Sequence, residues 1–197
     1  MPAERKTIDD FLPEFELAAK YEIAIRAPAH VVYECLLHAD FSQSRLIRTL
    51  MALRSGRRSH RAAATMDLRQ RLRGTGFVEL AEIPGQEIVI GVAGKFWRPD
   101  GGRCMDLTAD GFVGFCLPGY TKAAWNFTLA PASGNSTILA TETRIRCFGR
   151  GARWKFQLYW ILVGPFSGLI RKVLLKQIKV AAESKSGDPA SAGLAGQ

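Results

Sequence analysis

The sequence lacks the residue patterns of the common catalytic and metal-binding sites. It contains no HExxH, GxSxG, P-loop or DxDxDG motif, and its four cysteines form no CxxC pair. The histidines His30, His38 and His60 have no metal-site spacing. Carboxylates such as Glu79 are isolated in the sequence, so no acid, base and nucleophile form a set. We therefore predict no metal, no cofactor and no catalytic residue, and we favour a protein that is not an enzyme.

The pattern of an export signal is missing as well. No apolar run follows the charged residues of MPAERKTIDDFLPEF, so we expect a cytoplasmic protein. The most apolar run, Gln157 to Ile170, is interrupted by Gly164 and Pro165 and is shorter than the ~20 residues of a membrane-spanning helix. It favours a buried or interfacial helix, with attachment to the periphery of the inner membrane as an alternative. The cysteines that we expect to be reduced and mostly buried are Cys35, Cys104, Cys116 and Cys147.

Acidic residues are scarce in two strongly basic segments. Nine arginines between Arg45 and Arg73 accompany a single acid, Asp67, and the segment from Arg150 to Lys179 has seven basic residues and no acid. These segments favour anionic partners, such as an anionic membrane surface, although a merely solvated surface is the alternative. Nucleic acid is the less favoured partner, because no aromatic residue interleaves the first segment. The predicted basic surface consists of Arg45, Arg48, Arg54, Arg57, Arg58, Arg61, Arg171 and Lys172.

Hydrophobic periodicity predicts an α+β fold. An alternating strand ends at Pro28, and two short helices follow at residues 29–40 and 42–54. A short helix is expected from Thr65 to Gly74. Later strands are predicted at residues 76–83, 87–97, 112–117, 121–132 and 135–148, and a long helix at 152–183. Strands grouped apart from helices indicate a curved antiparallel sheet of about six or seven strands that grips the C-terminal helix.

Most of the chain fits one domain. We assign residues 1–14 to a flexible N-terminus, 15–183 to a single domain, and 184–197 to a disordered tail rich in Gly, Ser and Ala. Residues 55–74 form an Arg-rich insertion whose role the sequence leaves open.

Alternation divides the predicted C-terminal hairpin into two faces. One face carries Ala123, Trp125, Phe127 and Leu129, together with Leu139, Thr141, Thr143, Ile145 and Cys147 of the facing strand. The other face carries Lys122, Asn126, Glu142, Arg144 and Arg146, which we expect to point towards water. On the final helix, a stripe at 3.6-residue spacing should face the sheet, and Tyr159, Leu162, Phe166 and Leu169 should broaden it. That stripe is Phe156, Trp160, Val163, Ser167, Ile170 and Leu174.

Three stretches resemble the START-like superfamily, also described as Bet v 1-like or helix-grip, which includes polyketide cyclase/dehydrase-type proteins (SRPBCC proteins). They are YEIAIRAPAHVVYECLLHADF, GFVELAEIPGQEIVIGVAGKFW, and the hairpin with the final helix. More narrowly, GKFW, PGYTKAAWNF and TETRIRC are similar to those of a bacterial subgroup that suggests no activity. The resemblance spans about residues 15 to 183. It implies an apolar cavity between sheet and helix that carries lipids, sterols, quinones or aromatic polyketides, with catalysis in a minority of members.

Together these patterns favour binding of a small hydrophobic ligand, either a lipid or an aromatic, polyketide-like molecule. The alternatives are a cyclase or dehydratase acting on an aromatic substrate, and a basic module that binds a membrane surface. The predicted cavity residues are Trp97, Phe112, Phe115, Trp125, Phe127, Thr141, Thr143, Phe156, Trp160 and Val163. Ordinary core packing is the alternative for each of them. The sequence leaves the ligand and the oligomeric state open.

Overall fold

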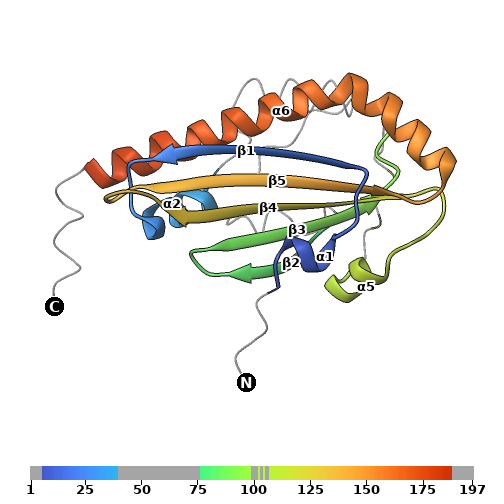
Figure 1. Cartoon of the computed structure of the whole chain (residues 1–197), viewed down its shortest axis with the longest axis horizontal. Coiled ribbons are helices and arrows are strands. Elements are labelled where there is room, and N and C mark those ends of the chain that lie inside the picture. Colours follow the sequence, from blue (N-terminus) through green and yellow to red (C-terminus); the bar gives the residue numbers. More distant parts are fainter. Residues whose placement is uncertain (1–5, 40–75, 99–101, 103, 105–106, 188–197) are drawn as a thin grey trace.

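The computed structural model describes residues 6–39, 76–98, 102, 104 and 107–187 of the chain. In these ranges, short helices and one antiparallel sheet precede a long C-terminal helix, which confirms the predicted α+β class (Figure 1). The helices are α1 (Ile8–Phe11), α2 (Ala29–Leu37), α5 (Ala109–Gly114) and α6 (Arg150–Gly187). The strands are β1 (Leu17–Ile25), β2 (Phe77–Ile83), β3 (Glu87–Gly94), β4 (Thr121–Pro131) and β5 (Thr137–Cys147).

The sheet is open and has the strand order β1-β5-β4-β3-β2, with every neighbouring pair antiparallel. β4 and β5 form the predicted hairpin, which pairs Trp125 with Thr143 and Phe127 with Thr141. Within the described ranges the sheet has five strands, fewer than the six or seven expected.

A segment expected to form a further strand is a helix instead. The prediction of a strand at residues 112–117 is wrong, because Ala109–Gly114 forms α5. Thr108 caps this helix, its hydroxyl oxygen accepting a hydrogen bond from the Gly111 backbone N–H at 3.1 Å, and Asp110 lies in the first turn. These terminal interactions outweigh the β-propensity of the apolar residues that follow.

α6 runs along the length of the sheet and forms the layer on one side of it (Figure 1). It packs mainly over β1 and β5 and also contacts α2. Pro165 lies inside α6 and removes one backbone donor, yet the helix continues through it and arches in Figure 1. α6 also includes residues 184–187, so the expectation that these four residues belong to a disordered tail is wrong.

The sheet face towards α6, which we call the inner face, carries two apolar clusters. In the first, Leu174 and Ile178 of α6 pack with Leu36 of α2 and Phe127 of β4. In the second, Phe156 near the N-terminus of α6 packs with Val92, Ala123, Ile145 and Cys147 of the strands. The hairpin residues in these clusters lie on the face that alternation predicts. α6 is therefore attached to the sheet at two separate places.

The opposite face, which we call the outer face, is covered by α1 and α5. The buried residues that form this third cluster are Ile8, Phe11, Leu12, Leu80, Val89, Phe112 and Ala124. The expectation of a flexible N-terminus therefore does not hold for residues 8–12, whose apolar side chains are buried against the sheet.

The same cover corrects the prediction that the polar side of the hairpin points towards water. Lys122, Asn126 and Arg144 do lie on the outer face, but each is at most 9% exposed. The Lys122 Nζ donates hydrogen bonds to the carbonyl oxygens of Phe112 and Val113, both at 3.1 Å. Burial, reinforced by the charge of Arg146, lowers the pKa of Lys122. The ammonium group of Lys122 thus supplies hydrogen bonds to carbonyl groups at the C-terminal end of α5, where partners within the helix are lacking.

Several predictions concern residues that lie outside the described ranges. They include the helices at residues 42–54 and Thr65–Gly74, the insertion at residues 55–74, and residues 188–197 of the tail. Six residues of the predicted basic surface also lie there, namely Arg45, Arg48, Arg54, Arg57, Arg58 and Arg61.

Replacing Gly91 with alanine should destabilise the fold. A Cβ atom at Gly91 would lie 2.8 Å from Phe112 Cδ2 and 2.9 Å from Leu80 Cδ1, both in the buried outer cluster. We expect Gly91→Ala to lower the free energy of unfolding by about 1–3 kcal/mol, as overpacking does, measured by urea denaturation. Gly114→Ala is the control, because a Cβ there meets no atom within 4 Å. Equal stability of the two variants would contradict the packing of α5 on β3.

Candidate functional site

The inner face is incompletely covered at Trp125, a half-buried residue that packs against the first apolar cluster. The strand register places Ala19, Thr143, Trp125, Ile90 and Glu79 side by side in one row across the sheet. Trp125 lies on the central strand β4 and is only half-buried, whereas Phe127, two residues further on, is fully buried. Trp125 is therefore a partly uncovered ring on the central strand, although Ile90 and Thr143 on either side of it are buried.

Trp125 is held in place by hydrogen bonds. Its Nε1–H donates to Thr141 Oγ1 at 2.7 Å, and the Thr141 hydroxyl donates to the carbonyl oxygen of Asn126 at 2.7 Å. Its ring packs on Phe127 with centroids 5.0 Å apart. Thr141, a predicted cavity residue, thus serves to orient the indole.

Arg171 reaches from α6 into this region. Its Nη2 donates to Thr143 Oγ1 at 2.5 Å, and its Nη1 donates to Ser167 Oγ at 2.8 Å. Its Nε is buried and has no hydrogen-bond partner, and no carboxylate of the described residues forms an ion pair with it. Burial lowers the pKa of Arg171, and the nearby Tyr21 opposes that shift. The prediction that Arg171 belongs to an outward basic surface is therefore wrong.

Gly168 allows α6 to approach β1 closely at this point. A Cβ atom at Gly168 would overlap the hydroxyl oxygen of Tyr21. The exposed Lys172 extends over the same ring, with its Nζ 5.8 Å from the centroid. We call Tyr21, Trp125, Thr143, Ser167 and Arg171 the inner-face site.

Most predicted cavity residues lie on the inner side of the sheet, but Phe112 and Phe115 do not. Phe127 and Phe156 are buried in the two inner clusters, while Trp97 and Trp160 pack half-buried against the second one. Val163 is half-buried on α6. Phe112 belongs to the outer cluster, and Phe115 packs against Tyr120 and Phe148. The two differ because their segment forms α5, which lies on the outer face.

Glu79 is an inner-face residue that the sequence could not assign to a face. Its Cα is paired with that of Ile90, which belongs to the inner cluster. The register shifts between Glu79 and Ala81, and this bulge obscures the alternation in GFVELAEI. The inner face therefore carries a carboxylate at β2 as well as the guanidinium near β5.

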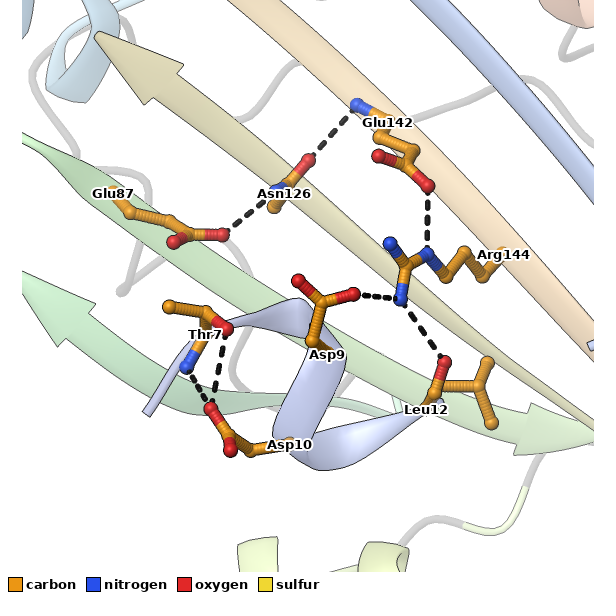
Figure 2. Close-up of polar contacts among 8 residues, drawn as sticks. All are labelled: Thr7, Asp9, Asp10, Leu12, Glu87, Asn126, Glu142 and Arg144. Carbon is orange, nitrogen blue, oxygen red and sulfur yellow. Dashed lines mark hydrogen bonds and ion pairs between the residues drawn. The ribbon is translucent and has the colours of Figure 1, made fainter. Parts of the chain in front are cut away.

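The outer face has a polar pocket of about 210 Å³ between α1 and the strands (Figure 2). Asn126 donates to Glu87 Oε1 at 2.7 Å and accepts from the Glu142 backbone N–H at 2.9 Å. Arg144 is 2.6 Å from Glu142 Oε1 through Nε and 2.6 Å from Asp9 Oδ1 through Nη1. Figure 2 shows these contacts joining α1 to β3, β4 and β5.

The charges of this outer pocket compensate one another. Burial disfavours the charged guanidinium of Arg144, but hydrogen bonds and charges of Glu142 and Asp9 outweigh burial and raise its pKa. Arg144 Nη1 also donates to the Leu12 carbonyl oxygen at 3.3 Å, at the end of α1. The network thus fixes α1 to the sheet, and the sequence could not reveal it because no periodicity links Asp9 to β5.

The outward face of α6 carries an exposed apolar stripe. Its residues, spaced as on one helix face, are Trp154, Leu158, Ile161, Leu162, Phe166 and Leu169. Ile161 is 75% and Leu162 70% exposed, so Leu162, Phe166 and Leu169 do not broaden the inward stripe as expected. Exposed basic residues flank the stripe: Arg150, Arg153 and Lys155 at one end, Lys172 and Lys176 at the other. Of the described helices, α6 alone is long and apolar enough to cross a membrane, by length and composition only.

Removal of Arg144 should weaken the attachment of α1. Arg144→Met would leave Glu142, whose side chain is 20% exposed, without its cation, and we expect a loss of roughly 2 kcal/mol of unfolding free energy. Arg146→Met is the matched control on the same strand. Its partner Glu14 is 74% exposed, so we expect a loss of at most ~0.5 kcal/mol. Chemical denaturation of both variants measures the difference, and equal losses would contradict the role of the pocket.

No protein-family profile and no curated protein matches the chain. Solved structures with some similarity include a protein from Chromobacterium violaceum, which is 14% identical with a TM-score of 0.37, over 84% of this chain and 96% of that one. A protein from Thermus thermophilus is 8% identical with a TM-score of 0.28, over 90% of this chain and 99% of that one. Both TM-scores are too low to carry an argument, so the resemblance to the START-like superfamily stays a prediction.

Proposed function

We propose that the protein binds a small hydrophobic ligand, a lipid or an aromatic molecule, between the inner face of the sheet and α6. The half-burial of Trp125 on the central strand is the observation that carries this proposal. Tyr21, Phe77, Tyr159 and Trp160 are also only partly buried beside the two clusters. A ligand that covered these rings would gain about 25 cal/mol for each Å² of apolar surface removed from water.

Binding is better supported than catalysis by the placement of the ionisable groups. Glu79 lies on β2 and Tyr21 on β1, which are the opposite edges of the sheet. Four inter-strand spacings of ~4.8 Å separate these strands by roughly 19 Å. A cyclase or dehydratase needs an acid and a base on neighbouring atoms of one substrate. Glu79 and Tyr21 are too far apart to act as that pair.

Native mass spectrometry of the freshly purified protein tests this proposal. We expect a population with a bound small molecule that is released on denaturation and recovered by organic extraction. Ala19→Phe should reduce that population, because Ala19 is half-buried on the inner face and paired with Thr143 of the inner-face site. Ala18→Phe is the control, since Ala18 is exposed on the other face of the same strand. An empty spectrum and extract, with no uptake of added lipids or aromatic molecules, would contradict ligand binding.

Docking of α6 on an anionic membrane surface is a second candidate function, carried by the exposed apolar stripe. A helix with one apolar face and basic residues at its ends is suited to the interface of anionic lipids. Both features are present along the outward side of α6. Phe156 and Leu174 are buried against the sheet, so the outward side of the helix is what remains for a membrane.

Sedimentation with lipid vesicles tests this docking. We expect the protein to bind vesicles of phosphatidylcholine mixed with phosphatidylserine more tightly than phosphatidylcholine alone, and added salt to weaken the binding. The double variant Ile161→Ser, Leu162→Ser should bind at least roughly tenfold more weakly, because two exposed apolar side chains are lost. Val113→Ser is the control, since Val113 is an exposed apolar residue of α5. Self-association through the stripe without vesicle binding would instead assign it to a second copy of the chain.

A further inference from the structure

We infer that the ligand of the inner-face site is an acidic amphiphile whose carboxylate binds Arg171 while its apolar body lies against Trp125. This inference rests on the proposed ligand-binding function and specifies the ligand class. It is carried by an uncompensated cation on the inner side of the sheet, where the rest of the described surface is mostly apolar.

The comparison between the two sheet-facing arginines shows what Arg171 lacks. Arg144 on the outer face contacts two carboxylates, Glu142 and Asp9, each at 2.6 Å. Arg171 has only hydroxyl partners and a backbone carbonyl among the described residues, and its buried Nε–H has no acceptor. Arg171 is half-buried and its Nε is fully buried, and charged groups removed from water are as a rule paired with an opposite charge. The missing partner of Arg171 is therefore an anion that the described residues do not supply.

The groups around Arg171 can all donate hydrogen bonds. The hydroxyl oxygens of Thr143 and Ser167 accept from the guanidinium, so each hydroxyl hydrogen can be directed to another acceptor. The Tyr21 hydroxyl lies against Gly168, one helical turn from Arg171. These three hydroxyl groups and the Arg171 Nε–H are therefore all available as hydrogen-bond donors. They suit a ligand that only accepts hydrogen bonds, such as an ionised carboxylic acid.

The net charge of the site favours a carboxylate over a phosphate. Arg171 contributes a single positive charge, and a carboxylate neutralises it with two oxygens that suit the planar guanidinium. A phosphate monoester carries about −1.5 to −2 at neutral pH and would leave uncompensated negative charge beside the apolar clusters. Lys172 is exposed, so water screens its charge, and its Nζ lies 5.8 Å from the centroid of the Tyr21 ring.

Isothermal titration of ligand pairs that differ only in the acid group tests the inference. The probes are dodecanoate against dodecanol and naphthoate against naphthalenemethanol. We expect the wild-type protein to bind at least one acid roughly ten- to hundredfold more tightly than its alcohol, as a charge-assisted hydrogen-bonded pair provides. Arg171→Met should abolish this preference while retaining affinity for the alcohol. Lys172→Met, which removes the adjacent exposed cation, should keep the preference.

The thermal midpoint separates ligand recognition from a structural role. Because Arg171→Met removes a half-buried, uncompensated charge whose Nε has no acceptor, it should leave the thermal midpoint unchanged or raise it. A structural Arg171 would instead lower the midpoint, and its loss would weaken the binding of acid and alcohol alike. Thr143→Val is a second variant, expected to weaken binding of the acid but not of the alcohol. If Arg171→Met does not fold, the result for Thr143→Val decides between ligand recognition and a structural role.

The outcomes distinguish the two proposals. Equal affinity of the wild-type protein for acid and alcohol overturns the inference and leaves hydrophobic ligand binding intact. If no probe binds and native mass spectrometry finds no small molecule, ligand binding itself is wrong, and the inference fails with it.

Discussion

The packing of α6 at two separate places on the sheet is the constraint on which the rest of the structure depends. Phe156 fixes one end of the helix, and Leu174 with Ile178 fixes the other half. A helix held in this way spans the interval between its contacts, and Pro165 lies within that interval. The strands beneath continue without interruption, so Trp125 faces a stretch of helix that does not cover it completely. The inner-face site therefore follows from where the helix is attached.

The two faces of the sheet solve the problem of buried charge in different ways. On the outer face, Arg144 is surrounded by Asp9 and Glu142, so the chain itself supplies the compensation, and α1 is fixed as a result. On the inner face, Arg171 is hydrogen-bonded to hydroxyl groups that carry no charge. An uncompensated buried donor costs about 1–3 kcal/mol, which is a substantial fraction of the stability of a small domain. The inferred anion would remove that cost when it binds.

The sequence predicts the parts of this fold that depend on short-range periodicity. Alternation places Trp125, Phe127 and Thr143 on one face correctly, and helical spacing places Phe156 and Leu174 against the sheet. Features that depend on packing between distant segments are missed. Arg144 is buried because α1 packs against it, and its partner Asp9 lies far from it in the sequence. Arg171 points inward because Thr143 on β5 lies within hydrogen-bond distance. Local composition could not separate Arg171 from its neighbour Lys172, although Arg171 is half-buried and bonded to Thr143 while Lys172 is exposed.

The middle of α6 shows why composition alone is ambiguous for this chain. The outward side carries exposed apolar residues such as Ile161 and Leu162, while the inward side carries the polar Ser167 and Arg171. The inward side also carries the half-buried apolar residues Trp160, Val163 and Ile170, so the usual amphipathic pattern is kept there except at Ser167 and Arg171. The exposed apolar stripe and the inward guanidinium are both features that the packing of a core does not require. They are the features of α6 that bear on membrane docking and on ligand binding.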